Sequence, residues 1–112
     1  MHESPKIYIP IFSRRLKEAR TKAGFSQKRL GIMAGIDEFV ASTRINRYEK
    51  GIHQADEETA VMLAQVLGVP LAYFYAEDND LAELILGFSQ LNGEDGKEVL
   101  DFVRKKLDSE ND

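Results

Sequence analysis

Apolar residues recur three or four positions apart along most of this 112-residue chain, and glycine or proline separates the periodic runs. This spacing is typical of amphipathic helices, which bury one face. Gly24, Gly51 and Gly68 each follow a run, where a glycine commonly ends a helix. The pattern predicts an all-α protein. Its expected helices cover about residues 11–23, 27–34, a segment ending at 50, 57–67 and 71–75, and two more carry the apolar positions of 81–91 and 99–107.

The stretch from Ser26 to Gly51 predicts a short helix, a turn that contains glycine, and a second helix closed by glycine. Ser26 is a favourable N-cap residue for the first of these helices. Two helices joined in this way form a helix-turn-helix, whose second helix enters the major groove of DNA. The expected buried positions are Leu30, Met33 and Ala34 on the first helix and Ile45 and Tyr48 on the second.

The outward face of the second helix carries short hydroxyl groups and forked cations. Hydroxyls can bond base edges, and a planar guanidinium matches both guanine edges and phosphates. We therefore expect this helix to be a recognition helix whose side chains bind DNA. The residues concerned are Ser42, Thr43, Arg44 and Arg47.

Four segments in a fixed order carry a family resemblance: LKEAR at 16–20, AGFSQ at 23–27, YEKG at 48–51 and LAQVLGV at 63–69. Over roughly residues 11–75 the chain resembles the Cro/C1-type (XRE, phage repressor-like) helix-turn-helix transcription regulators. The resemblance implies a five-helix, lambda repressor-like DNA-binding domain. We place this domain at residues 11–76 and a C-terminal two-helix extension at 77–112.

In this family the arginine at the position of Arg20 pairs with the glutamate late in the recognition helix, which is Glu49 here. The resemblance therefore implies a structural ion pair. A forked guanidinium that holds a carboxylate would fix the first helix against the recognition helix. The alternative is two solvated charges on separate helices.

The resemblance also implies contacts with the DNA backbone at both ends of the motif. Gln27 lies in the first helical turn, where free backbone amides favour a phosphate. Its side chain is expected to bond a phosphate or a neighbouring base-reading side chain. Lys28 is either a phosphate contact or a solvated surface lysine. The loop after Gly51 approaches the backbone in this family, so His53 and Gln54 are expected to donate to phosphates.

The connection before the recognition helix departs from the family pattern, because residues 37–40 make it about four residues longer than the usual tight turn. Asp37 can cap a helix, so the recognition helix is expected to begin either one turn early, near Glu38, or after a longer loop packed through Phe39. Arg44 and Arg47 are placed more securely by their register to the YEKG segment.

The formal net charge of −4 argues against a nucleic-acid ligand until its distribution is considered. Residues 13–51 hold ten basic and four acidic side chains, whereas residues 52–112 hold four basic and fourteen acidic ones. Only the local field near a contact surface is weakly screened, since the Debye length is about 8 Å at physiological salt. The basic part coincides with the helix-turn-helix, which favours DNA binding over a chance distribution of charge.

Several classes of function are not expected. The chain has no cysteine, no apolar run long enough to span a membrane and no signal-peptide pattern, so we expect a cytoplasmic protein. It has no phosphate-binding glycine loop, no HExxH segment and no Ser/His/Asp set. The only histidines, His2 and His53, lack metal-ligand spacing. We therefore predict neither an enzyme nor a cofactor or metal site.

Two smaller segments have alternative interpretations. Residues 1–10 predict an irregular arm whose apolar residues pack on the domain or on a second subunit, or else a frayed end. The aromatic run at residues 73–75 suggests base stacking, but it stands between an acidic helix and Glu77-Asp78. Core packing is therefore the favoured interpretation of the aromatic run.

The last two predicted helices carry apolar stripes that must be buried on the domain or on another subunit. We expect them to form a dimerisation hairpin, since one recognition helix reads few bases and such domains usually bind paired half-sites. The expected function is sequence-specific binding of a double-stranded operator by a homodimeric, prophage-type repressor. The alternatives are an antitoxin-like module whose acidic half binds a toxin protein, and a protein–protein scaffold without DNA binding.

Overall fold

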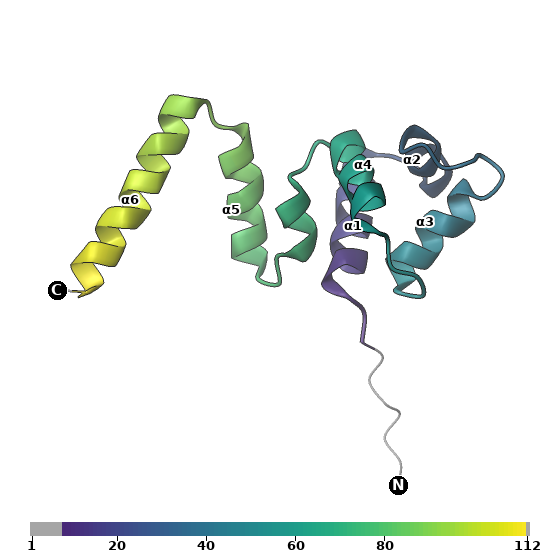
Figure 1. Ribbon diagram of the computed structural model, residues 1–112, viewed down its shortest axis with the longest axis horizontal. Helices are drawn as coiled ribbons and strands as arrows, with labels where there is room; N and C mark the ends of the chain where they lie inside the picture. Colours follow the sequence, from purple (N-terminus) through teal and green to yellow (C-terminus); the bar gives the residue numbers. More distant parts are fainter. Residues whose placement is uncertain (1–7, 112) are drawn as a thin grey trace, which may run out of the picture.

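The computed structural model describes residues 8–111, and within this range it contains α-helices, one short 3₁₀ helix and no strand (Figure 1). The predicted all-α class is confirmed. No described helix is both long and apolar enough to cross a membrane. The elements are α1 (Ile11–Ala23), α2 (Gln27–Met33), α3 (Ala41–Lys50), α4 (Glu57–Leu67), η1 (Leu71–Tyr75), α5 (Asn79–Gln90) and α6 (Gly93–Asn111).

The hydrophobic core takes one large, fully buried side chain from each of the first five elements. These are Leu16, Leu30, Ile45, Leu63 and Phe74, each with 0% of its surface exposed. Fully burying a side chain of this size is worth about 1.5–3 kcal/mol. The core thus joins α1, α2, α3, α4 and η1 into one unit.

The aromatic run on η1 belongs mainly to this core. Tyr73 and Phe74 are buried, and the Phe74 ring meets that of Phe12 edge-on, with centroids 4.9 Å apart. Tyr75 is more exposed but still lies 5.7 Å from the Phe12 ring. The core-packing interpretation is therefore confirmed for Tyr73 and Phe74. Of the N-terminal arm, residues 1–7 lie outside the described residues, while Tyr8 and Ile9 are exposed.

The buried face of α2 differs from the predicted one. Met33 is exposed, and Gly31 is buried instead, beside Leu30 and Ala34. α2 ends at Met33, with Ala34 as its C-cap. The side facing α3 is the one that carries Gly31, and the absence of a side chain there lets the two helices approach closely.

The long connection between α2 and α3 is a loop, and α3 begins at Ala41. The expected early start near Glu38 is therefore wrong. Asp37 accepts a hydrogen bond from the Phe39 amide (2.9 Å) through its side chain and one from the Val40 amide (3.1 Å) through its carbonyl, which closes a turn instead of starting a helix. The alternative of packing through Phe39 is also wrong, since 87% of this side chain is exposed.

The C-terminal helices are attached to the core through α5. Ala82 is buried in the core, and Ile85 and Leu86 pack against it. α6 lies beyond α5, at the opposite end of the molecule from α3 (Figure 1). The alternative in which both helices complete a monomeric core therefore fails for α6, whose apolar residues Leu100, Val103 and Leu107 are exposed.

The last helix, α6, starts at Gly93, so Gly96 lies within its first turn and does not interrupt it. The side-chain oxygen of Asn92 accepts the amide hydrogen of Asp95 at 2.8 Å and serves as the N-terminal cap. Gly96 faces the Phe88 ring, and a Cβ at this glycine would lie 3.6 Å from it.

Gly31→Ala should destabilise the protein, although alanine favours a helix interior by about 1 kcal/mol over glycine. The new Cβ would lie 2.8 Å from the Cβ of Ala41 and 3.1 Å from its Cα, so α2 would be pushed off α3. We expect a loss of about 1–3 kcal/mol in the free energy of unfolding, measured with urea. Gly93→Ala is the control, since a Cβ at this exposed glycine meets nothing within 4 Å and should change the free energy of unfolding by less than about 0.5 kcal/mol. A Gly31→Ala protein as stable as wild type would contradict this account of the α2–α3 contact.

Candidate nucleic-acid interface

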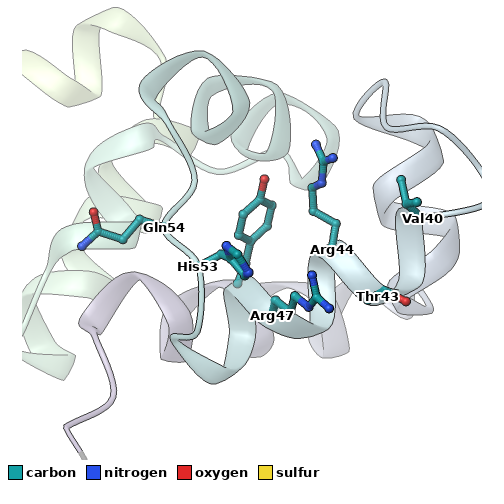
Figure 2. Close-up of a pocket in the computed structure, with 7 residues that line it drawn as sticks. Val40, Thr43, Arg44, Arg47, His53 and Gln54 are labelled. Carbon is teal, nitrogen blue, oxygen red and sulfur yellow. The ribbon is translucent and has the colours of Figure 1, made fainter.

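An open cleft of about 460 Å³ runs along the exposed side of α3 (Figure 2). Arg44 and Arg47 project from α3 into this region, and His53 faces them from the loop that follows the helix. Four predicted site residues, Thr43, Arg44, Arg47 and His53, therefore share one surface. The complete lining is Val40, Thr43, Arg44, Arg47, Tyr48, His53 and Gln54.

Gly51 turns the chain back along the side of α3. Its φ of +74° lies in the left-handed region that favours glycine, and a Cβ there would be 2.7 Å from Cδ of Pro10. The amide of Ile52 then donates to the Arg47 carbonyl at 2.9 Å, and the chain continues into His53. Only a glycine fits this turn, which brings the loop against the recognition helix.

The same loop ends at Asp56, the N-cap residue of α4. The side chain of Asp56 accepts the amide hydrogen of Thr59 at 2.8 Å and caps α4. Hydrogen bonds from Thr59 hold the pKa of Asp56 below its usual value, so this carboxyl stays ionised at neutral pH. The loop is thus anchored at Gly51 on one side and at Asp56 on the other.

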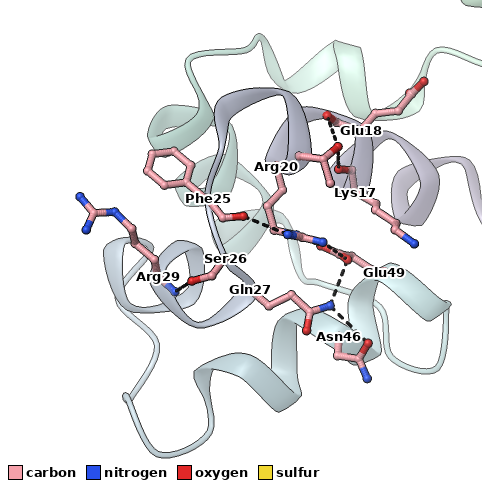
Figure 3. Close-up of polar contacts among 10 residues, drawn as sticks. Lys17, Glu18, Arg20, Phe25, Ser26, Gln27, Arg29, Asn46 and Glu49 are labelled. Atoms are coloured by element: carbon pink, nitrogen blue, oxygen red, sulfur yellow. Dashed lines mark hydrogen bonds and ion pairs between the residues drawn. The ribbon is translucent and has the colours of Figure 1, made fainter.

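The carboxylate of Glu49 on α3 receives contacts from side chains of α1 and α2 and so joins three helices (Figure 3). Arg20 of α1 donates to it twice, from Nε to Oε2 at 2.6 Å and from Nη2 to Oε1 at 3.1 Å. The Arg20 Nη1 atom also donates to the carbonyl of Phe25 at 2.9 Å. The side chain of Arg20 is 13% exposed and that of Glu49 only 3%. This is a bidentate, largely buried ion pair, not two solvated charges.

Gln27 of α2 completes this group of contacts. Its Nε2 atom donates to Oε1 of Glu49 at 3.1 Å and to Oδ1 of Asn46 at 3.3 Å. An amide nitrogen carries two hydrogens, so both are used within the protein. Gln27 thus orients α3, and in this arrangement its side chain has no hydrogen left for a phosphate. Sequence reasoning missed Asn46, whose only signal was its place one turn before Glu49.

The remaining candidate residues are exposed and stand outside the cleft lining: Lys28 on α2 and Ser42 on α3. Within residues 8–111, no carboxylate forms an ion pair with Arg44 or Arg47. Both guanidiniums therefore keep their donors for an external partner. The surface can therefore bind a polyanion, and its directed guanidinium donors can also select particular hydrogen-bond acceptors on that ligand.

Comparison with known proteins agrees with this geometry. The helix-turn-helix family model matches residues 16–74. The chain belongs to the helix-turn-helix family. It is 32% identical over 107 residues to the SPbeta prophage-derived uncharacterized HTH-type transcriptional regulator YonR of Bacillus subtilis (strain 168), which covers 86% of this chain and 95% of that protein. The crystal structure of the transcriptional regulator BswR matches with a TM-score of 0.81 and 47% identity, over 87% of this chain and 96% of that one.

Arg20→Ala should destabilise this helix-turn-helix strongly, because it leaves the buried carboxylate of Glu49 without its charged partner. The expected cost is about 3–5 kcal/mol, which lowers the melting temperature by more than about 10 °C for a chain of this size. Lys17→Ala removes an exposed charge from the same helix and serves as the control. Equal melting temperatures for the two variants would show that the ion pair contributes nothing to the fold.

Proposed function

We propose that this protein is a prophage-type transcriptional repressor that binds one specific operator in the cytoplasm as a homodimer. That it is a DNA-binding transcriptional regulator follows from its helix-turn-helix family and from two relatives named as transcriptional regulators. One relative is also named as prophage-derived. Neither name refers to an antitoxin, and nothing favours that alternative.

The observation that carries the proposal is a pair of guanidiniums on the outer face of α3 that form no ion pair within the described residues 8–111. In the proposed complex, α3 lies in the major groove, where a forked guanidinium can bond O6 and N7 of one guanine. Arg44 and Arg47 are assigned to base edges, and Ser42 and Thr43 supply hydroxyls beside them. Lys28 on α2 and His53 on the loop after α3 are assigned to phosphates, and these contacts set the register of the protein on the duplex.

The homodimer is proposed from the exposed apolar face of α5 and α6. The two helices diverge from their connection (Figure 1), and a groove of about 440 Å³ lies along α5 and reaches Val99 of α6. Leu84 and Phe88 line it with about half of each side chain exposed. A contiguous apolar surface of this kind is typical of an interface. The complete exposed set is Leu81, Leu84, Phe88, Leu91, Leu100, Phe102, Val103 and Leu107.

A second copy of the chain suits this surface because the hairpin is complementary to itself. Asp80 and Glu83 flank the apolar groove on α5, while residues 104–106 of α6 are basic. In a two-fold dimer each subunit offers both parts to the other. The acidic excess of residues 52–112 would also keep this interface away from DNA and turn the two basic parts towards it.

Arg44→Ala and Arg47→Ala should each weaken binding to the preferred duplex by about 1–3 kcal/mol and relax base preference at one position. Fluorescence anisotropy with all single-base variants of that duplex measures both effects. Lys28→Ala is the comparison, since loss of a phosphate contact weakens all sequences alike and lowers the salt dependence by about one unit. Wild-type affinity and base preference in both arginine variants would contradict the assigned register of α3.

Leu84→Glu should dissociate the dimer, because it buries an unpaired charge in the proposed interface. The expected change in the dimer dissociation constant is about 100-fold or more, measured by sedimentation equilibrium without DNA. The monomer should keep its helical content, as Leu84 lies outside the core. Gln90→Glu adds the same charge at another exposed position of α5 and should leave the dimer intact. An intact wild-type protein that sediments as a monomer at tens of micromolar would contradict the proposal.

A further inference from the structure

The short linker from η1 to α5, residues 76–78, is held from one side by Arg15 of α1. The Nε atom of Arg15 donates to the Ala76 carbonyl at 2.9 Å, and Nη2 donates to the Glu77 carbonyl at 3.2 Å. Only 3% of Arg15 is exposed. One rigid guanidinium thus fixes two successive carbonyls that belong to neither helix.

Arg15 is itself held in a single orientation. Its third nitrogen, Nη1, bonds Oε2 of Glu18 at 3.0 Å, and the guanidinium lies 5.8 Å from the centroid of the Tyr73 ring. The hydroxyl of Tyr73 approaches the same Glu18 oxygen at 3.5 Å. Burial, together with the Glu18 charge, raises the pKa of Tyr73, so the phenol remains protonated as a donor. These contacts leave the guanidinium of Arg15 little freedom to turn.

α5 begins at Asn79, directly after the linker of residues 76–78 that Arg15 holds. The side chain of Asp78 accepts the amide hydrogen of Leu81 at 3.0 Å and caps the helix. One turn into the helix, Ala82 is buried in the core. The direction in which α5 leaves the domain is therefore set both by Arg15 and by the packing of α5 on the core. Arg15 belongs to α1, the same helix that holds α3 through Arg20.

We propose that Arg15 is a positioning residue that sets the spacing between the two operator half-sites. The proposal rests on the homodimer through α5 and α6. In that dimer the two recognition helices are connected through the two linkers, through the packing of α5 on each core and through the shared interface. A rigid linker holds the recognition helices at one separation and one angle, and a loose linker allows many.

DNA makes this rigidity measurable. Moving one half-site by two base pairs shifts it by about 7 Å along the axis and turns it by about 70° around the helix. A dimer with fixed linkers loses one set of contacts when the spacing is wrong, whereas a flexible dimer keeps both. Affinity for a single half-site is expected to be the same in both cases, because Arg15 does not line the cleft along α3 and contacts the linker instead.

The test uses full-length Arg15→Lys, which keeps the charge and the stem but cannot hold two carbonyls with one planar fork. Its matched control is Arg14→Lys, since Arg14 is the exposed neighbour whose contact with the Glu77 carbonyl is long, at 3.4 Å. Affinities are measured for a single half-site duplex and for duplexes whose half-sites are moved in steps of one base pair. Should Arg15→Lys fail to fold, an insertion of two glycines between Glu77 and Asp78 takes its place.

Wild type and Arg14→Lys are expected to lose about tenfold or more in affinity two base pairs from the best spacing. Arg15→Lys should remain a dimer and bind the single half-site like wild type. Its affinity two base pairs from the best spacing should fall by less than about threefold. If folded Arg15→Lys keeps a steep spacing preference, or if it also loses affinity for the single half-site, the proposed role of Arg15 is overturned while the homodimer still stands. A wild-type protein that prefers no spacing would overturn this role and the proposed homodimer together.

Discussion

The carboxylate of Glu49 is the contact on which the placement of the recognition helix depends. It receives two hydrogen bonds from Arg20 of α1 and one from Gln27 of α2, and it lies on α3 itself. A buried carboxylate is costly unless it is paired and hydrogen-bonded. Here all of its partners come from the helices that must hold α3, so the charge is stable only when the three helices are assembled.

Helix α1 holds two other parts of the structure in place through largely buried arginines. Arg20 holds α3, and Arg15, five residues earlier, holds the linker to α5. One helix therefore relates the surface proposed to face DNA to the helices proposed to join two subunits. Within residues 8–111, every buried side-chain nitrogen and oxygen has a hydrogen-bond partner. The polar groups in the core thus specify how the elements are oriented, while the apolar residues around Leu16 and Phe74 supply the burial.

The features that could be predicted from sequence are those that a local pattern or a family motif carries. Helical periodicity and Gly68 predicted the bounds of α4, and the register of YEKG placed Arg44 and Arg47 on one helix face. The recognition helix was found because Ile45 and Tyr48 keep helical spacing before Gly51, and its loop was found through the family resemblance. These signals depend on neighbours within about four positions.

What could not be predicted depends on contacts between distant parts of the chain. The bond from Arg15 to the Ala76 carbonyl spans 61 positions and involves a backbone atom, which leaves no trace in residue type. Exposure of Phe39 and Met33 was missed because an apolar residue suggests burial, whereas the close approach at Gly31 decides which side of α2 faces α3. Asn46 was overlooked for a similar reason, since only its contact with Gln27 distinguishes it from other polar residues of α3.

Selection of bound sequences from a random duplex pool by the full-length wild-type protein tests the central claim most directly. If α3 of each subunit reads the major groove of one operator, the enriched sequences will share a two-fold symmetric consensus. Its two halves will be separated by one helical turn, about 10 base pairs, or a whole number of turns. A pool that shows no enrichment after repeated rounds, with binding that depends on salt alone, would contradict sequence-specific recognition by this helix.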